Sequence, residues 1–266
     1  MNIFQAAILG IVQGVTEVLP ISSSGHLVLF PWLFKFPDPG LAFDVALHMG
    51  TLIAIIAFFR DDWLEIIKGF FLGLKKLKFQ TAKEKLSILI ILATIPGAIL
   101  GFVLDKMAEN AFRNPLLIAA TTLIFAFVLI LAEKNVGKKK IEEETSKSAL
   151  LTGLAQAVAI IPGVSRSGVT ISAGMFQGFT REAAAKFSFL VSAPIILGAG
   201  LVEVRKIPIA EYSTLVFWTG LISAIIASFL TVRFLMNFVK SHKLNIFAYY
   251  RIGLTVVILI AYYLTR

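Results

Sequence analysis

The chain has 266 residues, of which 58% are apolar and only 15% are charged, whereas soluble domains carry about 45–50% apolar and about 25% charged residues. Together with a mean hydropathy of +0.86, this composition excludes most water-soluble enzyme folds and predicts a chain that folds in lipid. The sequence has no cysteine, which excludes disulfides, thiolate catalysis and cysteine-ligated metal sites. The formal charge of +9 comes from basic residues that lie mostly between apolar runs. We therefore expect anionic membrane lipid, and no nucleic acid, to be the partner of this charge.

Six apolar segments are long enough to cross the hydrocarbon core, which takes about 20 helical residues. They cover residues 41–59, 86–104, 116–132, 184–202, 213–235 and 246–264. Two further apolar regions, 3–34 and 149–180, are interrupted by the runs LPISSSGH and IPGVSRSG, and each piece is too short to cross. Because irregular backbone at membrane depth needs protein or water around it, these regions are predicted to be broken, re-entrant helix hairpins. The predicted fold class is an all-α integral membrane protein with six transmembrane helices and two such hairpins.

The two hairpins are related in sequence. At an offset of 143 positions, residues 10–25 and 153–168 share six identities: Gly10/Gly153, Gln13/Gln156, Val15/Val158, Ser22/Ser165, Ser24/Ser167 and Gly25/Gly168. Composition alone predicts about one identity over the same 16 positions. Each hairpin precedes three predicted spans, an odd number of crossings, so the second copy starts on the opposite face of the membrane. We therefore expect an inverted-topology repeat in a single membrane domain, with repeat one at about 1–135, a linker at about 136–147 and repeat two at about 148–266.

Loop charge predicts the orientation of the chain in the membrane. Fourteen Lys and Arg residues lie in the segments 60–85, 133–150 and 236–245, and four lie on the opposite face. Because cytoplasmic loops are enriched in basic residues, the first face is predicted to be cytoplasmic and the first hairpin to open outward. The run KKKIEEE at 138–144 is interpreted as a solvated linker between the repeats.

The first hairpin gathers groups that can perform chemistry. Gln13 and Glu17 are four residues apart and share a helix face, and a short polar run follows them: Ser22, Ser23, Ser24, Gly25 and His26. A carboxylate in an apolar hairpin is costly unless it meets a partner, a metal or water, which makes Glu17 a site candidate. A serine run alone is more often a helix cap or turn. With Glu17 and His26 nearby, however, the cluster contains a nucleophile, a base and a metal ligand or proton acceptor.

The second hairpin supplies a cation. Arg166 lies in PGVSRSG, and a guanidinium matches phosphate with two parallel hydrogen bonds. Hydroxyls of Ser165, Ser167 and Thr170 would add donors around the same anion, although the Walker pattern GxxxxGK[ST] is absent. The alternative is an arginine that reaches the lipid headgroups, which we favour less because the repeat aligns Arg166 with Ser23.

Several other residues in the spans have weaker interpretations. Asp44 and His48 either face a cavity or form a structural pair, and Arg251 is interpreted as a structural pair or as reaching the headgroups. Close helix contacts are the interpretation of four glycines: Gly97, Gly101, Gly198 and Gly200.

The motifs QGVTEVLPISSSGH and PGVSRSGVT, in this order and at this separation, resemble the two signatures of the bacterial undecaprenyl pyrophosphate phosphatases of the bacitracin-resistance type. The resemblance covers the whole chain. It implies an enzyme of the bacterial inner membrane that hydrolyses undecaprenyl diphosphate to undecaprenyl phosphate and inorganic phosphate, which recycles the lipid carrier for cell-wall synthesis. It also implies a divalent cation, commonly magnesium or calcium, and a homodimer. Combined with the loop charge, it predicts an active site that faces the periplasm or the outside.

The motifs also imply residue roles. Catalytic roles fall on Glu17, Ser23, His26 and Arg166, with Glu17 also the metal ligand. Substrate-binding roles fall on seven residues: Gln13, Ser22, Ser24, Gly25, Ser165, Ser167 and Thr170. We expect Ser23 to attack phosphorus after activation by His26, and direct attack by His26 is the alternative.

A second function is also compatible with the predicted architecture. Inverted repeats with broken helices build secondary transporters, so the alternative is a polyprenyl-phosphate flippase or transporter.

Overall fold

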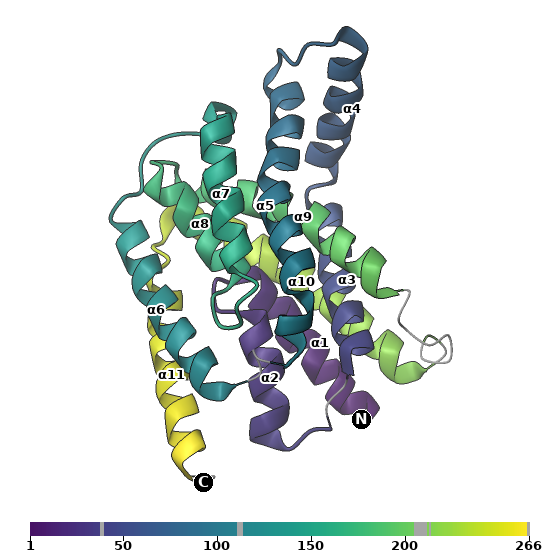
Figure 1. Ribbon diagram of the computed structural model, residues 1–266, viewed down its shortest axis with the longest axis vertical. Helices are drawn as coiled ribbons and strands as arrows, with labels where there is room; N and C mark the ends of the chain where they lie inside the picture. The colour runs from purple at the N-terminus through teal and green to yellow at the C-terminus, as the bar shows by residue number, and fades with distance from the viewer. Residues whose placement is uncertain (38–39, 111–113, 205–211, 213, 265–266) are drawn as a thin grey trace.

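The computed structural model describes residues 1–37, 40–110, 114–204, 212 and 214–264, without the side chains of residues 41–42 and 104–110. In this part the chain is helical, and its only β-type pairing is an isolated bridge between Lys139 and Phe179 (Figure 1). The helices are α1 (Ile3–Val18), α2 (Ser23–Phe34), α3 (Gly40–Phe58), α4 (Arg60–Lys76), α5 (Ala82–Asn110), α6 (Pro115–Glu133), the 3-10 helix η1 (Ile141–Glu143), α7 (Ser146–Val158), α8 (Arg166–Phe176), α9 (Arg181–Glu203), α10 (Leu215–Ser241) and α11 (Asn245–Leu264).

The predicted all-α membrane fold is confirmed. Five helices are long and apolar enough to cross a membrane, namely α5 (over Ala82–Val103), α6, α9, α10 and α11, and each contains or overlaps a predicted span. The sixth predicted span falls on α3, which meets the same test only together with α4, from which it is bent by 83°. Residue 213, where one predicted span starts, lies outside the described residues. The same holds for the side chains of the four basic residues that were counted for the outer face.

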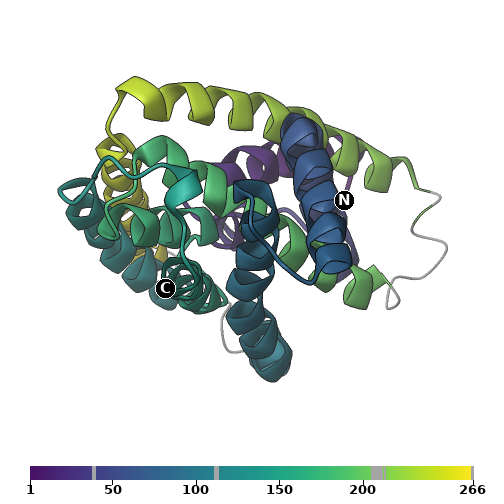
Figure 2. The ribbon, with the colours of Figure 1, turned by 90° about the horizontal axis from the view of Figure 1, so that it is seen from above.

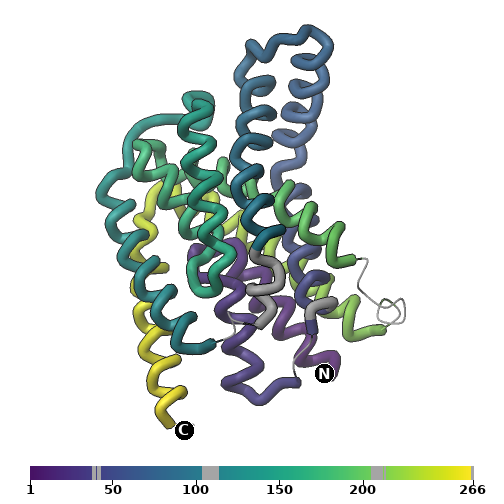
Figure 3. The backbone as a smooth tube through the Cα atoms, viewed as in Figure 1, coloured from purple at the N-terminus to yellow at the C-terminus, as the bar shows by residue number. Residues whose placement is uncertain are grey.

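Helix α4 was not predicted, because its charged residues indicate a loop. Its first turn carries Asp61 and Asp62 and its last turn Lys75 and Lys76, an arrangement that complements the helix dipole. Together with the start of α5 it forms a helical hairpin that projects beyond the other helices (Figures 1 and 3). Asp62 accepts hydrogen bonds from Lys83 at 3.0 Å and from Lys186 of α9 at 2.8 Å, so the base of this hairpin is tied to the body of the protein.

The linker between the halves is less solvated than predicted. Lys138, Lys139 and Lys140 are exposed, but the Glu144 carboxylate accepts a hydrogen bond from Ser148 at the start of α7. Burial raises the pKa of Glu144 to about 7, against the opposing effects of the Ser148 hydroxyl and Lys139. Because this pKa lies above the ordinary 4.5, the stability that the protonated carboxyl contributes is full below pH 4.5 and is lost as pH rises through about 7.

Close helix packing brings the first hairpin into the bundle. Helix α1 lies against α10, which runs along one edge of the bundle (Figure 2). A Cβ at Gly10 would lie 2.4 Å from the carbonyl oxygen of Gly220 on α10, so only glycine allows this approach. The polar last turn of α1 is thereby held inside the protein.

The two hairpins, α1–α2 and α7–α8, break in the same way. Ser22 caps α2 with φ 77° and Ser165 caps α8 with φ 72°, backbone that non-glycine residues adopt at an energetic cost. Each serine hydroxyl accepts a hydrogen bond from the third residue on, Gly25 N–H at 3.3 Å and Gly168 N–H at 3.1 Å. This shared geometry supports the internal repeat, while the opposite orientation of the two halves stays a prediction.

The breaks of the two hairpins are in contact. Ser167 of α8 donates a hydrogen bond to the Leu19 carbonyl at 3.1 Å. Arg251 of α11 joins them further, because it is fully buried and donates only to backbone carbonyls. Those acceptors are Thr122 (3.1 Å), Pro20 (3.3 Å), Val164 (3.1 Å) and Gly163 (2.7 Å). Arg251 is therefore structural, and it does not reach the membrane surface.

Candidate active site

A cavity of about 470 Å³ lies where the two hairpin breaks meet α3, α5 and α9. Its polar lining consists of Glu17, Ser23, Ser24, Asp44, His48, Gln156, Ser165 and Arg166. The rest of the lining is apolar or small and includes Leu27, Val28, Gly97, Gly101, Ile160, Ile195, Ile196, Ala199 and Gly200. A compact polar cluster thus shares one cavity with a largely apolar lining.

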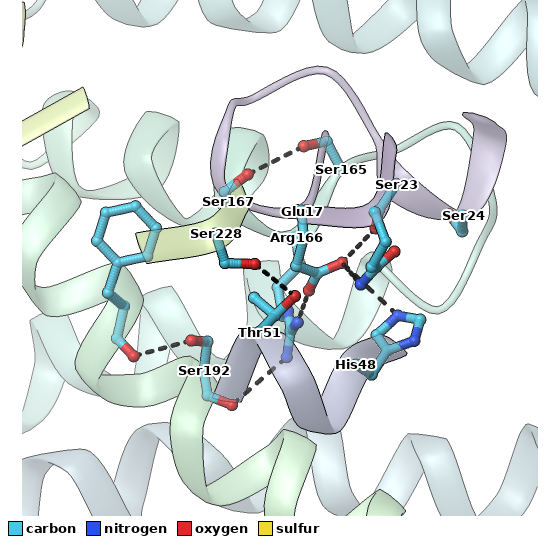
Figure 4. A network of polar contacts seen from close by, with 12 residues as sticks. Glu17, Ser23, Ser24, His48, Thr51, Ser165, Arg166, Ser167, Ser192 and Ser228 are labelled. Carbon is cyan, nitrogen blue, oxygen red and sulfur yellow. Dashed lines mark hydrogen bonds and ion pairs between the residues drawn. The ribbon is translucent and has the colours of Figure 1, made fainter. Parts of the chain in front are cut away.

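Glu17 is the centre of the polar cluster (Figure 4). Its Oε1 accepts from Arg166 Nη2 and its Oε2 accepts from the Ser23 hydroxyl. Gln13 Nε2 donates to Oε2 at 3.3 Å, and His48 Nε2 lies 3.6 Å from the same oxygen. The Glu17 side chain is only 6% exposed, so its charge depends on these partners.

The hairpin breaks explain why these side chains meet. Glu17 lies in the last turn of α1, Ser23 begins α2 and Arg166 begins α8. Free backbone N–H groups and the positive end of the dipole make a helix N-terminus an anion site, and here the starts of α2 and α8 both border the cavity. The Arg166 guanidinium is held from behind by the Ser192 carbonyl, which accepts from Nη1 at 3.4 Å. The arrangement therefore combines a hydroxyl hydrogen-bonded to a carboxylate with a cationic end for an anion.

The sequence predicts that His26 activates Ser23, but the structure does not bring the two side chains together. His26 Nδ1 is 2.7 Å from the Ser22 carbonyl, which can only accept, so this nitrogen carries the hydrogen. Nε2 then accepts from the Tyr250 hydroxyl at 2.8 Å, and the ring stacks on Tyr250 with centroids 5.8 Å apart. His26 is buried and absent from the cavity lining. Both nitrogens are thus engaged: Nδ1 bonds the residue that caps α2, and Nε2 joins α2 to α11.

Two of the seven predicted substrate-binding residues line the cavity, Ser24 and Ser165. The other five, Gln13, Ser22, Gly25, Ser167 and Thr170, do not, because their polar atoms hold the hairpins or Glu17. Thr170, for example, donates to the Arg166 carbonyl at 2.7 Å and pairs with Ser188 at 2.6 Å. In this structure the five lie behind the lining, and their direct contact with substrate stays a prediction.

Two further residues line the cavity: His48, for which the sequence left two interpretations open, and Gln156, which the sequence did not indicate as a site residue. His48 Nδ1 donates to the Asp44 carbonyl at 2.8 Å, which orients the ring so that Nε2 faces Glu17 Oε2 at 3.6 Å. Gln156 lines the cavity from α7, and its only signal in the sequence is that the repeat aligns it with Gln13.

The donors around Glu17 fit a hard divalent cation. Among the described residues no three acidic or imidazole side chains gather into a ready-made metal site. However, Gln13 Oε1 is buried beside Glu17 and accepts no hydrogen bond from any described residue. Magnesium is commonly held by one or two protein oxygens plus substrate phosphates, a donor set that Glu17 and Gln13 can begin.

The fold and the site define a class, the polytopic all-α membrane proteins with a polar site between paired helix breaks. The family described as "Bacitracin resistance protein BacA" matches residues 6–257, and the chain belongs to this family. Proteins named undecaprenyl-diphosphatase are similar over their whole length. That of Moorella thermoacetica is 45% identical over 268 residues, covering 100% of both chains. That of Elusimicrobium minutum is 46% identical over 98% of both chains. That of Caldicellulosiruptor bescii is 47% identical over 100% of this chain and 99% of its own.

Proposed function

We propose that this chain is an undecaprenyl-diphosphatase. It hydrolyses undecaprenyl diphosphate to undecaprenyl phosphate and inorganic phosphate and so recycles the lipid carrier for cell-wall synthesis. The observation that carries the proposal is the cluster of Ser23, Glu17 and Arg166 in a cavity whose remaining lining is largely apolar. Full-length relatives of that name support it, and the comparisons do not support the alternative flippase.

The geometry assigns a role to each of the three residues. Ser23 Oγ attacks the terminal phosphorus, and Glu17 Oε2, which already accepts its hydrogen bond, takes the proton. The bridging P–O bond breaks and undecaprenyl phosphate leaves with the bridging oxygen. Water then attacks the phosphoserine, which releases inorganic phosphate and returns a proton to Ser23. Glu17 therefore replaces His26 as the proposed base.

Arg166 and the starts of α2 and α8 stabilise the charge of the phosphoryl group during transfer. An incoming phosphate competes with Glu17 for the guanidinium. Glu17 Oε1 is then released, and with Gln13 Oε1 it would hold a magnesium or calcium ion. When bound, such a cation neutralises negative charge on the diphosphate.

We expect purified protein to release phosphate from farnesyl diphosphate that is labelled in its terminal phosphate. Release should occur when magnesium is present and should stop when a chelator removes the metal. An acid quench should retain label as acid-stable phosphoserine. Ser23→Ala should lower release by at least about 10³-fold and abolish the adduct. Ser228→Ala, which removes a buried hydroxyl outside the cavity, is the matched control and should stay near wild type. An acid-labile adduct would indicate histidine instead, and no release with any divalent cation would contradict the proposed function.

We further propose that this multi-pass membrane protein lies in the bacterial plasma membrane with the site facing outward, as loop charge favours. The natural absence of cysteine allows a direct test with single cysteines on exposed positions. An impermeant thiol reagent should label Asn114→Cys in intact cells, and should label Lys78→Cys only after permeabilisation. The reverse pattern would invert the topology. A homodimer is also proposed, and the mass in detergent by light scattering checks it.

A further inference from the structure

The cavity has a second polar group that the proposed chemistry does not use. Gln156 of α7 is only 3% exposed and lines the cavity. Neither its amide nitrogen nor its amide oxygen has a hydrogen-bond partner among the described residues. Buried amides are costly when unpaired, so this side chain is built to meet a group that occupies the cavity.

Beside Gln156 the cavity has a part lined by small residues of α5 and α9, here called the groove: Gly97, Gly101, Ala199 and Gly200. A Cβ built at Gly97 would lie 2.6 Å from Ile195 Cδ1 of α9 and 3.4 Å from Gln156 Nε2, so α5 and α9 pack closely at Gly97 and the amide lies beside this contact. The predicted role in close helix contact does not hold for Gly101 and Gly198, since a Cβ at either position meets no atom of the described residues within 4 Å. Gly101 instead leaves open space.

Apolar residues of the groove lie close to a part of α5 that faces lipid. The cavity wall is apolar, with Ile160, Ile195 and Ile196 among its lining. Next to Gly101 on α5, Phe102 is 88% exposed on a helix that qualifies as a membrane span. An uncharged hydrogen-bonding group and an apolar lining close to lipid match a phosphate ester that carries a hydrocarbon chain.

We propose that Gln156 and this groove bind the leaving half of the substrate. The Gln156 amide nitrogen donates to the phosphate that stays on the lipid, and the first isoprenoid units lie between α5 and α9 along Gly97, Gly101, Ala199 and Gly200. This assignment rests on the proposed function. It places the terminal phosphate at Arg166 and the bridging oxygen between the two ends of the cavity.

The groove is tested by filling the space at Gly101. Gly198 of α9 is the matched control, because it also has open space at its Cβ but does not line the cavity. Gly101→Leu should raise KM for farnesyl diphosphate about tenfold with kcat changed less than about twofold. For isopentenyl diphosphate the rise should be smaller, because Gly101 lies one helical turn, about 5.4 Å, beyond Gly97. Gly198→Leu should leave both KM values unchanged. Gly101→Ala, with one added methyl group, keeps the series informative if the leucine variant does not fold.

The amide is tested by Gln156→Leu, which should raise KM for both chain lengths by a similar factor of about ten. Gln177→Leu is the control, since that amide lies outside the cavity and donates to the Ala173 carbonyl at 3.0 Å. Equal effects of Gly101→Leu and Gly198→Leu, or of Gly101→Leu on both chain lengths, would overturn the groove assignment. An unchanged KM in Gln156→Leu would mean that only water pairs with the amide.

Binding of the two substrates as non-hydrolysable methylene diphosphonates gives Kd without turnover. Wild-type protein that binds these analogues in the predicted order but hydrolyses nothing would contradict the proposed function alone. Wild-type hydrolysis with unaltered Kd values in both variants would contradict the subsite alone.

Discussion

Arg166→Lys is expected to lower kcat/KM for a prenyl diphosphate by about 10³-fold or more, a loss of the size seen when a transition-state donor is removed. The guanidinium contacts Glu17 with one nitrogen and the Ser192 carbonyl with the other. A lysine ammonium is a point charge and cannot hold this orientation and also meet a phosphate with two parallel bonds. Steady-state phosphate release measures the effect, with the larger share in kcat.

Arg181→Lys is the matched control for Arg166→Lys. Arg181 also forms a largely buried pair, with Glu133, through Nε at 2.7 Å and through Nη2. That pair does not line the cavity. The control should lose thermal stability while keeping kcat/KM within a few-fold. Equal losses of activity in the two variants would show that any broken buried ion pair inactivates the protein, and the role of Arg166 would be structural.

Arg251→Met is expected to destabilise the fold by about 3–5 kcal/mol, the cost of leaving buried polar groups unpaired. Four carbonyls, in α6 and in both hairpin breaks, lose their donor at once. Thermal unfolding in detergent should show a fall in Tm of several degrees, with Arg251→Lys between wild type and Arg251→Met. Arg233→Met removes an exposed arginine of α10 and should leave Tm nearly unchanged. A wild-type Tm in Arg251→Met would refute the structural role.

The sequence predicted the meeting of Glu17 and Arg166, because a repeat with two broken hairpins places an acidic break against a basic one. It could not predict the partner of His26. That choice depends on α11, which brings Tyr250 from 224 positions away, and on a backbone carbonyl that captures the other nitrogen.

Three further features of the structure could not be predicted from the sequence, each for a different physical reason. Arg251 donates to backbone carbonyl oxygens, which carry no signal in side-chain patterns, so the sequence could not show its role in joining the hairpins. Helix α4 was missed because its amphipathic, charged pattern is also typical of a cytoplasmic loop. Gln156 was visible only as the repeat counterpart of Gln13, and its unpaired amide became apparent once α5, α7 and α9 were placed around one cavity.

The position of Arg251 in chain order has a consequence for biogenesis. Helix α11 follows every other described helix, so during translation both hairpins leave the ribosome before the side chain that joins them. Until α11 inserts, the carbonyls of Pro20, Gly163 and Val164 lack their shared donor, and the nascent protein has an unlocked pocket. Insertion of α11 supplies this donor, so the two hairpin breaks are joined by Arg251 only after both hairpins have been made.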